Sequence, residues 1–192
     1  FDAVFVAIGA HLAKKVNIPA QEASKILDAV SFLKEADENS ENKPLLGRRV
    51  AIYGGGNTAM DAARTAKRLG ADEAMIIYRR DREHMPAHEF EADEALSEGV
   101  KIHWLSTIKN METSSITVEK MQVVDGKAVP TGEYETLEAD SLILALGQEA
   151  DTDFLKHIEG ITFKEDGTTV EVNPSMMTGY PGIFAGGDMV PS

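Results

Sequence analysis

The chain has 192 residues, is 43% hydrophobic, contains no cysteine and carries a formal net charge of -13 at pH 7. This composition is typical of a soluble globular protein with one or two domains, and the lack of cysteine excludes disulfides, thiolate metal ligands and iron–sulfur ligation within these residues. The acidic charge disfavours nucleic acids and anionic membranes as partners. No signal peptide opens the chain and no apolar run approaches the roughly 18 residues of a membrane span, so we expect a cytoplasmic protein.

The two ends of the chain have the pattern of core strands. Residues 2–8 form a continuous apolar run that ends at Gly9, which is typical of a strand buried on both faces. Residues 183–188 resemble a strand that leads into a turn. Because the chain begins inside one such strand and ends just after the other, we expect the sequence to be an excised fragment.

A helix is expected between residues 19 and 34. Apolar side chains recur there with helical spacing, at Ala23, Ile26, Leu27, Val30 and Leu33. The polar segment 36–44 is expected to be a linker. Residues 21–44 are therefore assigned to a helix and a linker.

From residue 45 the sequence alternates between strands and helices. Strands are expected at 49–53 and 74–78, with a helix at 58–69 between them. Four alanines of this helix would pack against the sheet: Ala59, Ala62, Ala63 and Ala66. A β-α-β unit of about thirty residues has the size of a parallel-strand crossover.

The elements that follow complete an α/β domain over residues 45–147. We expect a helix at 88–97 that begins near Pro86, a strand at 100–105, a β-meander at 116–139 with turns at Asp125-Gly126 and Thr131-Gly132, and a buried strand at 141–146. The pattern predicts a Rossmann-like, three-layer nucleotide-binding domain that includes a β-meander.

The segment Gly54-Gly-Gly-Asn-Thr-Ala59, here called the glycine turn, matches the alanine-ending dinucleotide fingerprint. The first glycine permits the tight turn, the second lets the backbone approach a pyrophosphate, and the small last residue lets helix and strand pack closely. The amides at the start of the following helix would face the phosphates. The predicted phosphate-binding residues are Gly54, Gly55, Gly56, Asn57, Thr58 and Ala59.

The second strand of the unit ends in Tyr78-Arg79-Arg80, where proteins that bind NAD usually place an acidic residue. Two guanidinium groups suit a 2'-phosphate, so we expect NADPH to be preferred over NADH. The alternative is a solvated basic edge whose arginines pair with Asp72, Glu73, Asp81 or Glu83.

With these motifs, the sequence resembles the pyridine nucleotide-binding part of the glutamate synthase small-subunit family. The matching stretches are Phe1-Asp-Ala-Val-Phe-Val-Ala-Ile-Gly9, Gly54-Gly-Gly-Asn-Thr-Ala-Met-Asp61 with Arg64, Tyr78-Arg-Arg-Asp81 with Met85-Pro-Ala87, Leu144-Ala-Leu-Gly-Gln148, and Gly182-Ile-Phe-Ala-Gly-Gly-Asp-Met189. Members are NADPH-dependent flavoprotein oxidoreductases. Adrenodoxin reductase and dihydropyrimidine dehydrogenase carry related domains.

The resemblance implies an NADPH domain inserted into an FAD-binding domain, so that residues 1–20 and 148–192 are partial FAD-domain segments. Hydride would pass from NADPH to FAD, and electrons would leave through iron–sulfur clusters or a partner, such as the glutamate synthase large subunit. No side chain of this chain is assigned a catalytic role.

The resemblance also implies roles for individual residues. Gly9 and Gly147 would lie at the crossings between the domains, with Gln148 beside the cofactors. Gly187 and Asp188 would belong to the flavin site, where the aspartate meets the ribityl-phosphate region.

Asp61 would lie near the nicotinamide end of the site. The alternative for Asp61 is a charge that stabilises the start of its helix.

The chain departs from the family in two respects. It has no second glycine-rich fingerprint for FAD and no cysteines for iron–sulfur clusters. We therefore expect these residues to bind NADPH but to hold FAD weakly and to be inactive alone.

Other functions remain open from the residues. One is a non-catalytic domain that senses NAD(P)H, and another is a methyltransferase that uses S-adenosylmethionine, although Arg79 and Arg80 disfavour the latter. A metal site at His84, His88 or His103 is not expected, because Pro86 separates the first two and no third ligand is placed.

Overall fold

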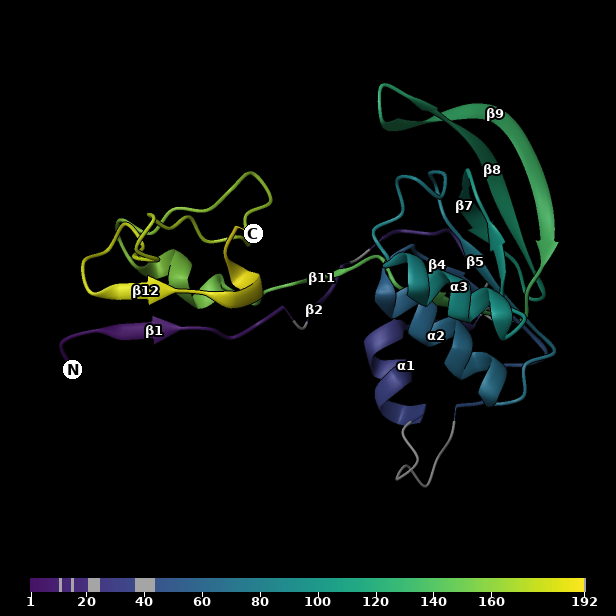
Figure 1. Ribbon diagram of the computed structural model, residues 1–192, viewed down its shortest axis with the longest axis horizontal. Helices are drawn as coiled ribbons and strands as arrows, with labels where there is room; N and C mark the ends of the chain where they lie inside the picture. Colours follow the sequence, from purple (N-terminus) through teal and green to yellow (C-terminus); the bar gives the residue numbers. More distant parts are fainter. Residues whose placement is uncertain (11, 15, 21–24, 37–43, 192) are drawn as a thin grey trace. The chain divides into compact units, whose positions relative to one another are not determined.

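The computed structural model describes residues 1–10, 12–14, 16–20, 25–36 and 44–191. The chain divides into two compact units, one made of residues 1–14 and 148–192 and the other of residues 15–147 (Figure 1). Most of the expected linker at 36–44, and Ala23 of the expected helix, lie outside the described residues.

A five-stranded parallel sheet forms the centre of the larger unit. Its strands lie in the order β3 (Lys25–Asp28), β10 (Ser141–Leu144), β4 (Arg49–Tyr53), β5 (Glu73–Ile77) and β6 (Lys101–His103). The central strand β4 is buried along nearly its whole length, as is β5. Apolar runs of this kind favour parallel strands that are covered on both faces.

Helices cover one face of the sheet and an antiparallel meander covers the other (Figure 1). The helices are α1 (Ala29–Ala36), α2 (Asn57–Arg68) and α3 (Glu89–Ser97), and the meander consists of β7 (Ser106–Met111), β8 (Ser115–Val124) and β9 (Lys127–Glu138). Successive side chains of β4 pack alternately into the two hydrophobic cores. Val50 and Ile52 face the helices, while Ala51 and Tyr53 face the meander. The expected three-layer α/β fold is confirmed.

The expected helix at residues 19–34 is wrong in part, because residues 25–28 form strand β3. This strand pairs in parallel with β10, and the helix begins only at Ala29. Ile26 and Leu27 are adjacent, yet they pack into the cores on opposite faces of the sheet. Pairing with a distant strand thus outweighs a local pattern that also fits a helix.

The meander corrects a second expectation. Asp125 and Gly126 do form the turn between β8 and β9, both with positive φ. Thr131 and Gly132, however, lie inside the continuous strand β9, where the register with β8 shifts. Gly132 has φ +81° and donates its N–H to the Glu119 carboxylate, so this pair forms a bulge rather than a turn.

The smaller unit is built on short strands. β1 (Val4–Val6) pairs in parallel with β12 (Ile183–Ala185), and β2 (Leu12–Ala13) pairs antiparallel with β11 (Gln148–Glu149). Two 3-10 turns complete it, η1 (Asp153–His157) and η2 (Gly187–Met189). Its core includes Leu155 and Met189.

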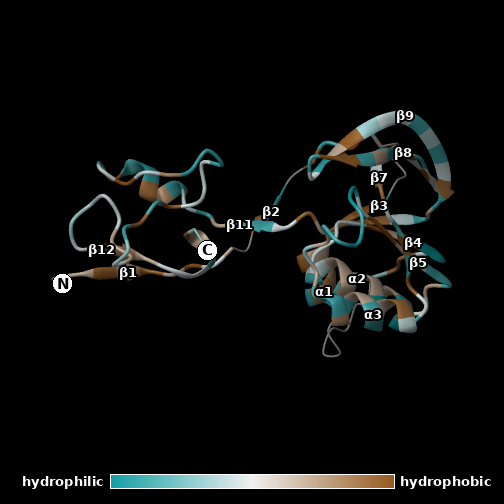
Figure 2. Ribbon diagram, turned by 45° about the horizontal axis from the view of Figure 1, so that its top comes forward, coloured by the Kyte–Doolittle hydropathy of each residue, from teal (hydrophilic) through white to brown (hydrophobic). Residues whose placement is uncertain are grey.

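Strand β1 is not buried on both faces as expected. Val4 is 50% exposed and Phe5 64% exposed, although both are apolar (Figure 2). Among the described residues β12 is the only strand that pairs with β1, so much of its surface has no cover. Hydrophobicity alone therefore predicted the strand but not its burial.

No helix in the described ranges is long and apolar enough to cross a membrane.

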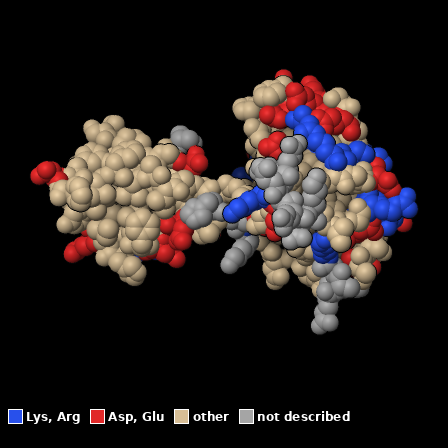
Figure 3. Space-filling model, turned by 90° about the horizontal axis from the view of Figure 1, so that it is seen from below, with Lys and Arg blue, Asp and Glu red and all other residues tan. Residues whose placement is uncertain are grey.

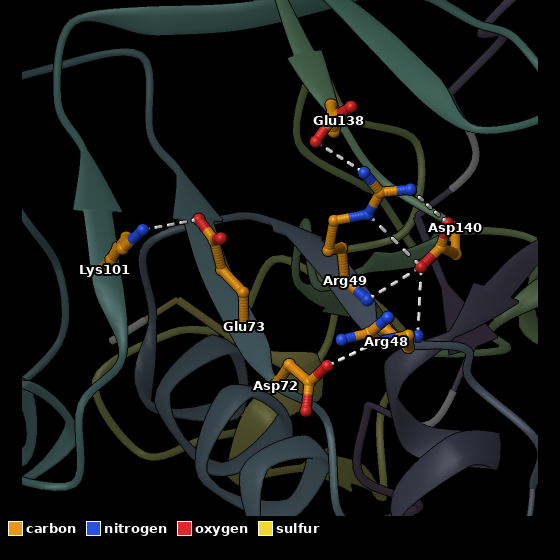
Figure 4. Close-up of polar contacts among 7 residues, drawn as sticks. All are labelled: Arg48, Arg49, Asp72, Glu73, Lys101, Glu138 and Asp140. Carbon is orange, nitrogen blue, oxygen red and sulfur yellow. Dashed lines mark hydrogen bonds and ion pairs between the residues drawn. The ribbon is translucent and has the colours of Figure 1, made fainter.

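A cluster of ion pairs lies at the amino edge of the parallel sheet, where β4, β5 and β10 begin (Figure 4). Asp140 accepts hydrogen bonds from the backbone N–H groups of Arg48 and Arg49 and from the Arg49 guanidinium. The hydrogen-bonded Arg49 side chain lowers the pKa of Asp140. The contacts tie the start of β10 to the start of β4. A cleft of about 400 Å³ beside the cluster is lined by Arg48, Arg49, Asp72, Glu73 and Asp140.

We predict that Asp140→Asn lowers the Tm of the protein at pH 7 by roughly 2–4 °C, because the charge that holds two strand ends is lost. The pKa of Asp140 is lowered from 3.8 in the folded state. Its stabilisation is therefore present above pH 3.8 and is lost as the pH falls through the lowered pKa. Thermal denaturation of wild type and variant should differ at pH 7 and converge in strong acid.

Glu138→Gln is the matched control. Glu138 pairs with the same Arg49, but its side chain is 78% exposed, so this substitution should barely move the Tm. Equal destabilisation by the two substitutions would contradict the role given to Asp140.

Candidate functional site

The glycine turn follows β4 at the carboxyl edge of the sheet and leads into α2. The connection that leaves β4 covers the helical face, whereas the connection that reaches the neighbouring strand β10 passes through the meander on the other face. The turn therefore lies where the two connections diverge. In open α/β sheets, ligands bind in the crevice at such a point.

The first two glycines are required by close contacts within the protein. Gly54 has φ +153°, and a Cβ there would lie 2.1 Å from the carbonyl oxygen of Ala145, which follows β10. A Cβ on Gly55 would lie 2.4 Å from the ring of Tyr78. Neither position has room for a side chain, and the turn is thereby pressed against the ends of β10 and β5.

Gly56 is different, because nothing lies within 4 Å of the place where its Cβ would be. Its φ of -91° is accessible to any residue, so the protein itself does not require glycine here. The following N–H groups, of Asn57 and Thr58, have no acceptor among the described residues. Open space beside unsatisfied amides at a helix N-terminus fits a phosphate group.

Helix α2 is held by a buried row of small residues and by one arginine. Ala59, Ala62, Ala63 and Ala66 are fully buried against the sheet, as expected. Arg64 forms ion pairs with Glu91 and Glu94 of α3 and with Glu98, the residue that follows this helix. Its guanidinium therefore joins α2 to α3 and to the residue that follows α3. Asp61 is exposed on the second turn of α2.

Arg79 and Arg80 follow β5 at the same edge of the sheet. Arg79 is exposed and Arg80 is half-buried. The Nε atom of Arg80 is buried and has no hydrogen-bond partner within the described residues. A buried donor without a partner is uncommon in proteins, and here it belongs to a charged group.

The remaining arginines of the chain are all neutralised. Five of the seven form ion pairs with carboxylates, namely Arg48, Arg49, Arg64, Arg68 and Arg82. Basic side chains adjoin acidic ones over the face of the larger unit seen in Figure 3. For Arg79 and Arg80, no ion pair is formed with any described residue.

Three of the four carboxylates that were considered as partners for this pair have other partners. Asp72 binds Arg48, Glu73 binds Lys101, and Asp81 binds His84. The side-chain hydrogen bond from His84 lowers the pKa of Asp81. The alternative of a self-neutralised basic edge therefore finds no support from these three residues.

The segment after the arginines folds back onto the glycine turn. We call residues 79–88 the arginine loop. The backbone N–H of Ala87 donates to the carbonyl of Gly55 at 3.0 Å, and the N–H of His88 donates to the Asn57 side chain at 3.0 Å. Sequence reasoning did not find these contacts, although Met85-Pro-Ala87 was among the motifs of the resemblance.

His84, His88 and His103, the histidines weighed as metal ligands, have separate surroundings. His84 pairs with Asp81, His88 stacks on Phe90 with ring centroids 5.6 Å apart, and burial lowers the pKa of His103. No cluster of three potential metal ligands exists within the described ranges.

The chain crosses from one unit to the other twice, at residues 14–15 and at residues 147–148. Gly147 is the last residue of the larger unit and has φ +94°, and Gln148 begins β11. In the smaller unit, the parallel strands β1 and β12 both lead into glycines at one edge, at Gly9 and at Gly186-Gly187. Asp188, in η2, is exposed.

Comparison with known proteins places the chain in a family. The model of the pyridine nucleotide-disulphide oxidoreductases matches residues 1–192. The chain belongs to this family.

Several relatives of this chain are named as subunits or small chains of oxidoreductases. It is 37% identical over 99% of its length to the NADP(+)-dependent formate dehydrogenase subunit beta of Moorella thermoacetica, and 32% identical over 98% of its length to the glutamate synthase [NADPH] small chain of Azospirillum brasilense. It spans 28% of the first relative and 44% of the second. The resemblance to the glutamate synthase small-subunit family is confirmed, and the family and relatives are NAD(P)H-dependent oxidoreductases.

Solved structures show the same fold at lower identity. The thioredoxin reductase of T. acidophilum superposes with a TM-score of 0.73 at 18% identity, and FprA from Mycobacterium tuberculosis in complex with NADPH gives 0.73 at 20% identity. The match covers 98% and 99% of this chain and 58% of each of those chains. These neighbours confirm the Rossmann-type oxidoreductase fold.

The contrast between Gly54 and Gly56 gives a prediction. Gly54→Ala should destabilise the protein by more than about 2 kcal/mol, since its methyl group meets the Ala145 carbonyl at a φ that alanine rarely adopts. Gly56→Ala should change stability by less than about 1 kcal/mol but lower the affinity for NAD(P)H at least about tenfold. Thermal denaturation and fluorescence titration measure the two effects. Unchanged nucleotide affinity in Gly56→Ala would argue against a phosphate at this position.

Proposed function

We propose that this chain binds NADPH, in preference to NADH, and presents it for hydride transfer to FAD. The observation that carries the proposal is the pair Arg79 and Arg80, which follows the second strand of the dinucleotide-binding unit and has no carboxylate partner among the described residues. In an acidic protein that neutralises its other arginines, two unpaired guanidinium groups favour an external dianion.

We assign each group of site residues a part of NADPH, and the geometry of the turn and of the arginines supports this assignment. The pyrophosphate would lie over Gly56 and accept hydrogen bonds from the N–H groups of Asn57 and Thr58, where the helix dipole of α2 favours negative charge. Arg79 and Arg80 would bind the 2'-phosphate through charge-assisted hydrogen bonds. Asp61, exposed on α2, would lie toward the nicotinamide end.

The flavin half of the proposal rests on the smaller unit. Gly9 follows β1, and Gly187 and Asp188 follow β12, at the edge where these parallel strands end. We assign this edge to the flavin site, with the Asp188 carboxylate toward the ribityl-phosphate region and with Gly147 and Gln148 at the passage beside the cofactors. When both cofactors are bound, NADPH supplies a hydride and FAD accepts it.

The route by which electrons leave FAD concerns the whole protein rather than these residues alone. The relatives named above are a beta subunit and a small chain, so we propose an electron-accepting partner subunit, such as a glutamate synthase large subunit or an iron–sulfur protein. We also propose a cytoplasmic location. No described side chain is assigned an acid, base or nucleophile role.

The NADPH preference is tested by titrating the protein with NADPH and with NADH and repeating both titrations with Arg79→Ala, Arg80→Ala and the double variant. Each charge-assisted contact that is lost should weaken NADPH binding about 10- to 100-fold. NADH affinity should stay nearly constant, because NADH has no 2'-phosphate.

Arg82→Ala is the matched control, because Arg82 lies in the same loop but pairs with Asp93. It should leave the preference for NADPH unchanged. Equal affinity of the wild-type protein for NADPH and NADH, or an undiminished NADPH affinity in the double variant, would rule out the 2'-phosphate assignment.

A further inference from the structure

The arginine loop is fastened to the glycine turn at both of its ends. At its start, the ring of Tyr78 lies against Gly55, and the Tyr78 hydroxyl donates to the carbonyl of His84 at 2.5 Å. At its end, the N–H of Ala87 donates to the carbonyl of Gly55, and the N–H of His88 donates to the side-chain oxygen of Asn57. The two arginines lie between these attachments.

Asn57 occupies an unusual position among these contacts. It is the first residue of α2, one position after Gly56, which occupies the N-cap position where a side-chain oxygen would bond an amide of its own helix. Its Oδ1 atom instead accepts the N–H of His88, the residue that precedes α3. The backbone of Asn57 therefore belongs to the phosphate-facing turn, while its side chain holds the far end of the arginine loop.

We propose that Asn57 is a positioning residue for cofactor specificity: by holding the arginine loop against the glycine turn, its side chain places Arg79 and Arg80 for the 2'-phosphate. The inference rests on the proposed function and adds to it. NADPH uses both the turn and the loop, whereas NADH uses the turn but has no phosphate for the arginines. Releasing the loop therefore weakens NADPH binding more than NADH binding.

The experiment compares the ratio of NADH to NADPH dissociation constants in wild type and in Asn57→Ala. Loss of one hydrogen bond that orders the loop should reduce this ratio about 3- to 10-fold. Asn57→Asp keeps the acceptor oxygen but adds a negative charge beside the pyrophosphate. This variant should bind both NADPH and NADH more weakly and leave the ratio of their dissociation constants near its wild-type value.

A second pair of variants removes the donor instead of the acceptor. The φ of His88 is -62°, which proline adopts, so His88→Pro deletes the N–H with little change of backbone. His88→Ala keeps the N–H and removes the imidazole that stacks on Phe90. We expect His88→Pro to lower the ratio as Asn57→Ala does, His88→Ala to retain it, and the effects of Asn57→Ala and His88→Pro not to add.

The outcomes separate this inference from the function on which it rests. If the wild-type protein shows no preference for NADPH, the proposed function and the inference fall together. If the wild type prefers NADPH but Asn57→Ala keeps the ratio, or lowers both affinities equally, the positioning role alone is refuted. Should Asn57→Ala not fold, His88→Pro against His88→Ala decides the same question.

Discussion

The approach of Gly54 to the carbonyl of Ala145 is the constraint on which the site depends. At the distance observed, no side chain can stand between the turn after β4 and the end of β10. This contact fixes the direction in which the chain leaves the sheet and enters α2, whose buried alanines then fit closely against β4 and β5. The first N–H groups of α2 have no acceptor among the described residues, and the space beside Gly56 is open.

Charge distribution explains how a strongly acidic chain can offer an anion site. Its carboxylates neutralise the arginines of the helices and of the amino edge of the sheet. Those ion pairs hold elements together, as Arg64 does between α2 and α3 and Asp140 between β4 and β10. Arg79 and Arg80, which follow β5 at the carboxyl edge of the sheet, form no ion pair with any described residue. The same acidic background would repel anions elsewhere on the surface.

The sequence was most informative where the determinants are local. The glycine turn, α2 and the arginines after β5 could be predicted, because spacing along one β-α-β unit defines them. Strand β3 could not, since its identity depends on pairing with β10, far away in the sequence. The bulge at Gly132 similarly depends on its partner strand.

Long-range contacts explain the other differences at the site. The side chain of Asn57 accepts the N–H of His88 from 31 residues away in the sequence, so no local pattern predicts the contact. The sequence does not show the role of Arg64 either. Its three carboxylate partners, on α3 and at the end of that helix, give it a structural role. The exposure of Val4 and Phe5 depends on the elements that pack beside β1, and the hydrophobicity of the sequence does not predict these neighbours.

The central claim is that an unpaired arginine pair recognises a 2'-phosphate. Calorimetric titration of the wild-type protein with adenosine 2',5'-bisphosphate and with 5'-AMP tests it without nicotinamide or flavin. We predict that the bisphosphate binds at least about tenfold more tightly and that the difference shrinks as salt is raised. Equal affinities for the two ligands, at low salt and at high salt alike, would contradict the claim.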